Sequence, residues 1–127
     1  MSRKKSVVLT DHELRLMEIL WKREQATVAD VVQALPPPEL AYSTVLTTLR
    51  TLEQKGYIEH REEGRAYVYR PIVPRQAAAK SATEYLLERF FGNSAGDLAV
   101  ALLDEAPLSD AHIRKIRRLL QRRKDER

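Results

Sequence analysis

The chain has 127 residues, no cysteine and a formal net charge of +4, with 43% hydrophobic and 31% charged residues. This composition is typical of a soluble globular protein with one domain or two small ones, and it excludes disulfides and thiolate metal sites. No stretch approaches the ~20 apolar residues of a membrane span, and no apolar run follows the basic N-terminus, so we expect a cytoplasmic protein without membrane insertion.

Two helices are predicted in the first 35 residues. Thr10 followed by Glu13 has the pattern of a capping box, and Thr27 followed by Asp30 has the same spacing of cap and carboxylate. Pro36–Pro38 end the second helix and form a stiff connector. The apolar residues at helical spacing form two stripes: Leu14, Met17, Leu20 and Trp21 in the first helix, and Val28, Val31, Val32 and Leu35 in the second.

The stretch 41–56, AYSTVLTTLRTLEQKG, predicts a third helix of unusual composition. It contains four threonines, which are β-branched and each cost a helix up to about 0.7 kcal/mol relative to alanine. Val45, Leu49 and Leu52 recur at helical spacing and are expected to face the core. Gly56 stands where a C-terminal αL cap belongs. The opposite side carries the polar residues Ser43, Thr47, Arg50, Thr51 and Gln54, with Thr44 on its flank.

After Gly56 the sequence pattern changes to a period of two. The runs YIEHRE and RAYVYR predict two strands separated by Glu63-Gly64, which indicates a short hairpin. Three helices followed by a hairpin have the order of a winged helix-turn-helix, in which the third helix is the recognition helix and the hairpin is the wing. We expect residues 1–73 to form this DNA-binding domain.

The threonines of the third helix have two interpretations. In a recognition helix, a threonine hydroxyl can donate or accept a hydrogen bond at a base edge, and its methyl group can pack on a thymine methyl. In the alternative, Thr47 and Thr51 are merely solvated, although a plain surface helix more often carries Glu, Lys, Gln or Ala.

Residues 74–127 predict three further helices. Gly92 ends the first, Ser94 with Asp97 starts the second as a capping box, and Ser109 starts the third. These helices are too short to close a core alone, so we expect a helical dimerisation domain that packs on a second copy. In the alternative they fold back on the N-terminal domain. The expected dimerisation residues are Leu86, Leu87, Phe90, Phe91, Leu98, Leu102, Leu103, Ile113, Ile116 and Leu120.

The predicted fold class is therefore mainly α with a small β-hairpin wing. His12, His60 and His112 lie far apart in sequence, and no phosphate loop, nucleophile elbow or paired-carboxylate motif occurs. We expect no catalytic residue, no cofactor, no metal site and no enzyme activity.

Two basic stretches remain. The N-terminal SRKK is either an arm that reaches DNA or a solubilising end, and we favour the second. Near the C-terminus, basic residues share one helix face that is expected to be the solvated side of an amphipathic helix. This face carries Arg114, Arg117, Arg118 and Arg122.

Three segments of the chain resemble the penicillinase-repressor family, also called BlaI/MecI/CopY: LTDHELRLMEILWKREQATVADVVQAL, AYSTVLTTLRTLEQKGYIEHREEGRAYVYRPIV and APLSDAHIRKIRRLL. The match runs from about Leu9 to Leu120. The resemblance implies a homodimeric winged-helix repressor that binds inverted repeats at promoters of antibiotic-resistance or metal-response genes. It also implies a sensor protease as a partner that inactivates the repressor.

The chain departs from the family pattern in three places. Staphylococcal members carry basic residues at the positions that align with Ser43 and Leu46, so base recognition here is expected to differ. Their cleaved Asn-Phe bond aligns near Ala101-Leu102, which lacks that residue pair. Copper-responsive members end in a cysteine cluster, and its absence here excludes thiolate copper sensing.

The sequence thus predicts a transcriptional repressor that binds an inverted-repeat operator as a homodimer and controls resistance or stress-response genes. The alternative is a winged-helix protein-interaction module without DNA binding, because the third helix offers few positive charges. The residues expected to read bases are Ser43, Thr44 and Thr47, and those expected to contact phosphates are Tyr42, Thr48, Arg50, Thr51, Lys55 and Arg65.

Overall fold

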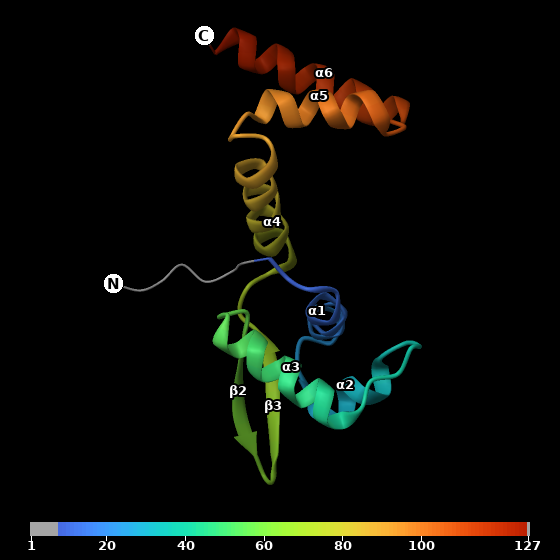
Figure 1. The fold of residues 1–127 in the computed structure, drawn as a ribbon, viewed down its shortest axis with the longest axis vertical. Coiled ribbons are helices and arrows are strands. Elements are labelled where there is room, and N and C mark those ends of the chain that lie inside the picture. The colour runs from blue at the N-terminus through green and yellow to red at the C-terminus, as the bar shows by residue number, and fades with distance from the viewer. Residues whose placement is uncertain (1–7, 127) are drawn as a thin grey trace, which may run out of the picture. The chain divides into compact units, whose positions relative to one another are not determined.

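The computed structural model describes residues 8–126 (Figure 1). The contacts between residues divide the chain into two compact units, one up to residue 86 and one from residue 87. This division lies later than the expected one at residue 73, so most of α4 belongs to the first unit. The elements are α1 Asp11–Arg23, β1 Ala26–Thr27, α2 Val28–Ala34, α3 Tyr42–Gln54, β2 Ile58–Glu63, β3 Ala66–Pro71, α4 Arg75–Phe90, α5 Ala95–Glu105 and α6 Asp110–Asp125.

Capping boxes start α1 and α2, as predicted. The Glu13 N–H donates to Thr10 Oγ1 (3.2 Å) and the Thr10 N–H donates to Glu13 Oε1 (2.9 Å). In the same way, the Asp30 N–H donates to Thr27 Oγ1 (3.1 Å) and the Thr27 N–H donates to Asp30 Oδ2 (3.0 Å). Each box satisfies two N–H groups that the first helical turn leaves without an intrahelical partner.

The buried face of α1 differs from the predicted stripe. Leu14 is 43% exposed, whereas Leu16 is fully buried together with Met17 and Leu20. A stripe through Leu14 and a stripe through Leu16 both fit helical spacing. Leu16 is the buried one because α3 and the sheet pack against its side of α1. Leu14 instead lines a hollow of about 240 Å³ beside Ala78 of α4. The prediction for Leu14 was therefore wrong.

The core of the first unit lies between α1, α2, α3 and the sheet. The three apolar residues predicted for α3 are all fully buried, and Ile58 and Tyr69 are almost fully buried as well. Burying a side chain of this size stabilises the fold by about 1.5–3 kcal/mol. The remaining core residues are Leu16, Met17, Leu20, Ala26, Val28, Val31, Leu35, Tyr57 and Ala78.

A Schellman motif ends α3. The Gly56 N–H donates to the Glu53 carbonyl and the Tyr57 N–H donates to the Leu52 carbonyl, both at 3.0 Å. Gly56 has φ +87°, a left-handed conformation that favours glycine, so the predicted αL cap is confirmed. The motif turns the chain directly from α3 into β2.

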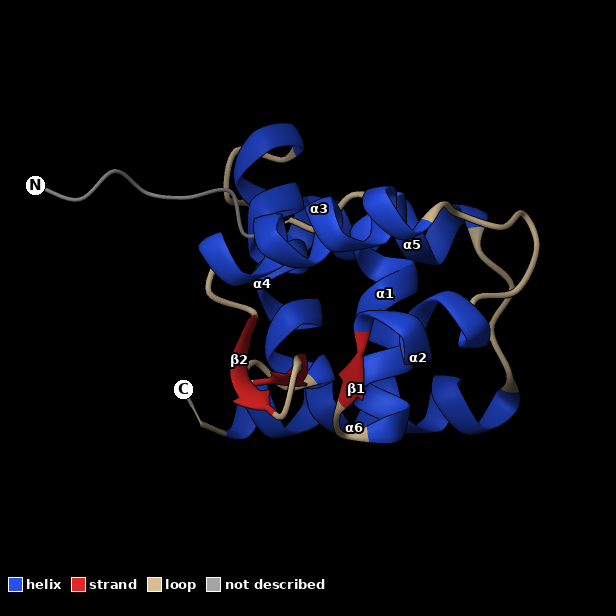
Figure 2. Cartoon of the chain, turned by 90° about the horizontal axis from the view of Figure 1, so that it is seen from below, coloured by secondary structure: helices blue, strands red, loops and turns tan. Residues whose placement is uncertain are grey.

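The sheet has three antiparallel strands in the order β1–β3–β2 (Figure 2). The short strand β1 was not predicted, since two residues are too few to show a period. The hairpin turn also lies one residue later than expected: Glu63 pairs with Ala66, so the turn is Gly64-Arg65. Gly64 has φ +64°, and a positive φ at the first of two turn residues is typical of a type II′ hairpin.

An ion pair joins the start of α1 to the end of α3. Lys55 Nζ lies 2.7 Å from Glu13 Oε1, and only 5% of Glu13 is exposed. Burial alone would raise the pKa of the Glu13 carboxyl, but the hydrogen bonds from Lys55 and the Thr10 N–H outweigh it and leave this pKa lowered. Glu13 is therefore held as a carboxylate in the folded protein.

Two further contacts attach loops and α4 to α1 within the first unit. Arg15 donates to the carbonyls of Pro36 (2.7 Å) and Pro38 (2.8 Å), which fastens the proline connector. Trp21 Nε1 donates to the Val73 carbonyl at 2.9 Å. The Arg75 guanidinium lies 4.9 Å from the centre of the Trp21 ring and is paired with Glu18 of α1. The first turn of α4 therefore packs on α1.

In the second unit, α5 and α6 begin at the predicted caps. Ser94 Oγ accepts from the Asp97 N–H (3.0 Å), and Ser109 Oγ accepts from the His112 N–H (3.1 Å). Neither helix contains a buried residue. Among residues 8–126, no helix is both long and apolar enough to cross a membrane.

We predict that Glu13→Gln lowers the free energy of unfolding at neutral pH by about 1–3 kcal/mol, since it removes the charge from a shielded hydrogen-bonded pair. A carboxyl whose pKa is lowered by folding stabilises the protein fully above the unfolded value of about 4.3, and this contribution is lost as the pH falls through the lower folded value. The difference between wild type and variant should therefore be largest near neutral pH and shrink in acid. Denaturant unfolding over a pH series measures it, and a difference independent of pH would contradict the assignment.

Candidate nucleic-acid interface

The polar face of α3 is exposed as predicted, except at Thr51, which is partly buried. At 100° per residue, Ser43, Thr47 and Gln54 lie opposite the buried apolar face, and all three are exposed. Arg50 lies beside them towards the wing, and Thr44 lies on the other flank; both are exposed. The helix therefore presents hydroxyl, amide and guanidinium groups on one side and closes the core with the other.

The four threonines of α3 fall into two pairs. Thr48 Oγ1 donates to the Thr44 carbonyl (2.8 Å), and Thr51 Oγ1 donates to the Thr47 carbonyl (3.1 Å). Their hydroxyl protons are thus engaged within the helix. In the part of the chain that the structure describes, the Thr44 and Thr47 hydroxyls make no hydrogen bond, so both remain able to donate to a ligand.

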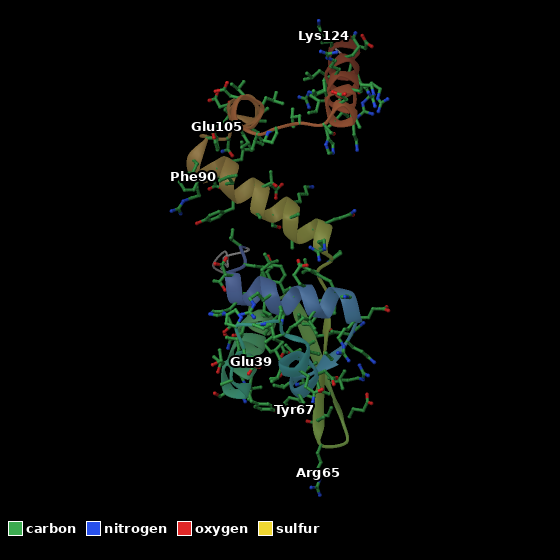
Figure 3. All side chains as sticks on the ribbon, turned by 90° about the vertical axis from the view of Figure 1, so that its right-hand side faces the viewer. Glu39, Arg65, Tyr67, Phe90, Glu105 and Lys124 are labelled. Atoms are coloured by element: carbon green, nitrogen blue, oxygen red, sulfur yellow. The ribbon has the colours of Figure 1, made fainter. Side chains whose placement is uncertain are left out.

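The wing places Arg65 at the tip of the hairpin. Its side chain extends away from the turn (Figure 3), and it has no ion-pair partner among the described residues. On the same hairpin, Arg61 is paired with Glu63 at 2.7 Å, and Arg70 is paired with Glu59. Arg65 is therefore the wing arginine with a guanidinium available to an anion.

A cleft of about 610 Å³ lies between α3 and the wing. Its α3 side carries Tyr42, Leu46 and Arg50, and its wing side carries Arg65 and Tyr67. Tyr42 is 57% exposed and Tyr67 is 44% exposed. Tyr67 was missed as a site residue, although the period-two pattern of its strand would have placed it on the same face as Tyr69.

His60 connects the wing to the end of α3. Its Nδ1 lies 2.8 Å from both carboxylate oxygens of Glu53, and its ring stacks on Tyr67 with centroids 4.4 Å apart. The sequence pattern indicated no role for this histidine. In the structure it positions the wing against the recognition helix.

Lys55 differs from the other predicted contact residues. Its ammonium group is bonded to Glu13, and only 18% of its side chain is exposed. An ammonium group held by a shielded carboxylate is a structural group, so we remove Lys55 from the candidate interface. Of the other predicted residues, Thr48 and Thr51 are partly buried. The rest are exposed on α3 and the wing: Tyr42, Ser43, Thr44, Thr47, Arg50 and Arg65.

The arrangement suits polyanion binding. Exposed hydroxyls can reach base edges, while Arg50, Arg65 and the Tyr42 hydroxyl can donate to phosphates. Within residues 8–126, no three His, Asp or Glu side chains are grouped so as to hold a metal ion. The basic stretch SRKK near the N-terminus lies outside the described residues.

Comparison with known proteins identifies the family. The family model named Penicillinase repressor matches residues 9–122. The penicillinase repressor of Bacillus licheniformis is 26% identical over 123 residues, which covers 96% of each chain. An uncharacterized 16.5 kDa protein of Latilactobacillus sakei is 32% identical over 113 residues, 88% of this chain and 77% of that protein.

A solved structure supports the same conclusion. The DNA-binding domain of the repressor BlaI, determined in solution, aligns with a TM-score of 0.51 and 30% identity, covering 59% of this chain and 93% of that domain. The predicted resemblance and the predicted fold class, mainly α with a hairpin wing, are confirmed. The chain belongs to the penicillinase repressor family of winged-helix, DNA-binding transcriptional repressors, which are not enzymes.

Proposed function

We propose that this transcriptional repressor binds an inverted-repeat operator as a homodimer and controls resistance or stress-response genes. The observation that carries the proposal is the exposed polar face of α3 beside a wing whose tip arginine is unpaired. A recognition helix of this kind lies in the major groove, and the wing contacts the adjoining backbone. Two copies related by a two-fold axis require two half-sites in inverted order.

Base contacts are assigned to Ser43, Thr44 and Thr47, since their side chains face outward. Phosphate contacts are assigned to Tyr42, Arg50 and Arg65, each of which is exposed and carries a donor. Thr48 and Thr51 are left out of this set, because each would have to give up its hydrogen bond within α3 in order to donate to a phosphate.

Exposed apolar side chains support the homodimer. Phe90 is 73% exposed, Leu102 56% and Leu120 57%, and neither α5 nor α6 buries any residue. Burial of each such side chain against a partner would contribute about 1.5–3 kcal/mol. A unit with large apolar residues and no buried one is not stable alone, so the proposal pairs it with a second copy through the residues predicted from the sequence.

The sensor protease implied by the resemblance is not part of this proposal. The Ala101-Leu102 bond lies inside α5, and its residues are not the Asn-Phe pair that staphylococcal members present. A protease binds an extended backbone, so cleavage at this bond would first require α5 to unwind.

We predict that Thr47→Ala weakens binding to the preferred site, selected from random duplex DNA, by about 1–3 kcal/mol and relaxes the preference at one position in each half-site. The fold should remain intact or gain up to about 0.7 kcal/mol, since alanine is the better helix former. Thr83→Ala in α4, whose hydroxyl donates to the Ala79 carbonyl, is the matched control. Melting and binding are measured on the same preparations; unchanged affinity in Thr47→Ala would show that this threonine is only solvated.

We predict that Arg65→Ala weakens binding to all DNA sequences alike and reduces the slope of log affinity against log salt by about 0.9 for each bound protomer, the value for one phosphate contact. Arg61→Ala removes the same charge from the same hairpin, but Arg61 is already paired with Glu63, so its effect should be smaller. Fluorescence anisotropy titrations at several salt concentrations compare the two. A loss confined to one base pair, with an unchanged slope, would argue against a phosphate role.

We predict that Leu102→Glu converts the protein to a monomer and weakens operator binding, because it places a charge in the proposed interface. Ile72→Glu, at a residue 48% exposed in the first unit, should leave the dimer intact. Sedimentation equilibrium measures the oligomeric state. Sites selected by the wild type should be inverted repeats with half-sites centred about 10 base pairs apart or at a multiple of that distance. A wild-type monomer, or unpaired selected sites, would refute the dimer.

A further inference from the structure

Helix α6 separates its charged and apolar residues onto opposite sides. At 100° per residue, Ile113, Ile116 and Leu120 form one stripe. The arginine face on the opposite side is defined by Arg114, Lys115, Arg118 and Arg122, which are all exposed. From Arg114 to Arg122 no carboxylate lies on this face; Asp125 lies on it one turn later, and Lys124, labelled in Figure 3, lies nearer the apolar stripe.

The charges of this face are not used within the protein. None of its four cations has an ion-pair partner among the described residues of the chain. The helix dipole favours positive charge in the last turn, which accounts for Arg122 but not for Arg114, Lys115 or Arg118 in the earlier turns. A solvated face was expected from the sequence. Such faces usually mix charges of both signs, whereas this one carries only positive charge from Arg114 to Arg122.

The recognition surface, by contrast, has few available positive charges. Lys55 is bonded to Glu13, and Arg61 and Arg70 are paired with Glu63 and Glu59, which leaves Arg50 and Arg65. Two cations neutralise two phosphates and give a weak electrostatic contribution to affinity, since the gain from counterion release scales with the number of phosphates contacted. DNA binding by this chain is therefore short of cations where α3 and the wing meet the duplex.

We propose that the arginine face of α6 is a second DNA-contacting surface, which binds phosphates without reading sequence. The proposal rests on the DNA binding proposed above. Successive arginines are four residues apart, a rise of about 6 Å, and duplex DNA presents three to four phosphates over that length. A second copy that covers the apolar stripe leaves this face in solvent, because the two lie on opposite sides.

The test removes three charges from full-length protein by Arg114→Gln, Arg118→Gln and Arg122→Gln together. Its matched control, Lys22→Gln, Arg23→Gln and Lys80→Gln, removes the same net charge from exposed positions of the first unit that lie outside the proposed interface. The probe is a random-sequence duplex of about 40 base pairs, titrated at several salt concentrations. Glutamine is a good helix former, and sedimentation with circular dichroism checks that both variants keep the wild-type fold and assembly.

The α6 variant should show a salt slope lower than the control by up to about 2.7 for each protomer in contact with the duplex, or 0.9 for each lost contact. For one protomer, this changes the affinity ratio about 40-fold between about 50 and 200 mM salt. A variant with lysine at the same three positions should retain the wild-type salt slope. Equal decreases of the salt slope in the α6 variant and in the control would attribute the effect to net charge alone and overturn the proposal. The proposal would also be overturned if the α6 variant kept the wild-type salt slope on DNA but lost binding to vesicles of anionic phospholipid. Failure of the wild type to bind any duplex would instead refute the proposed function.

Discussion

The placement of the recognition helix depends on the ion pair between Glu13, which is buried, and Lys55, which is partly exposed. The Glu13 carboxylate completes the capping box of α1 and also accepts from Lys55, the C-cap residue of α3. Removing either partner leaves the other charge shielded from water, which is strongly unfavourable. Gly56 follows at once with its positive φ and directs the chain into β2. One carboxylate thus fixes the start of α1, the end of α3 and the origin of the wing.

Once α3 is held by its neighbours, its outer face need not favour helix formation. Val45, Leu49 and Leu52 are fully buried, and each stabilises the fold by about 1.5–3 kcal/mol, against a cost of up to about 0.7 kcal/mol for each threonine. Tertiary packing therefore outweighs intrinsic propensity. A helix with four threonines is therefore ordered, and its outer face can carry residues suited to hydrogen bonding.

Features set by residues close in sequence could be predicted, and features set by distant ones could not. The caps at Thr10 and Thr27 join residues three apart, and the buried face of α3 follows from helical spacing alone. The Glu13–Lys55 pair joins residues 42 apart, so no local pattern showed that Lys55 was engaged. Leu14 and Leu16 both fitted helical spacing on α1, and only the position of its neighbours decided between them. The turn at Gly64 shifted by one residue, because glycine fits either central position of a hairpin turn.

The two surfaces proposed to meet DNA differ in what they contribute to binding. Hydrogen bonds from threonine hydroxyls to base edges discriminate between sequences, whereas arginine contacts to phosphates strengthen binding to every sequence equally. Adding cations to α3 would increase affinity without increasing the ratio of specific to non-specific binding. A recognition helix with Arg50 as its exposed cation keeps that ratio dependent on the hydroxyl contacts. Charge on a separate helix can then vary the overall affinity without changing which bases are recognised.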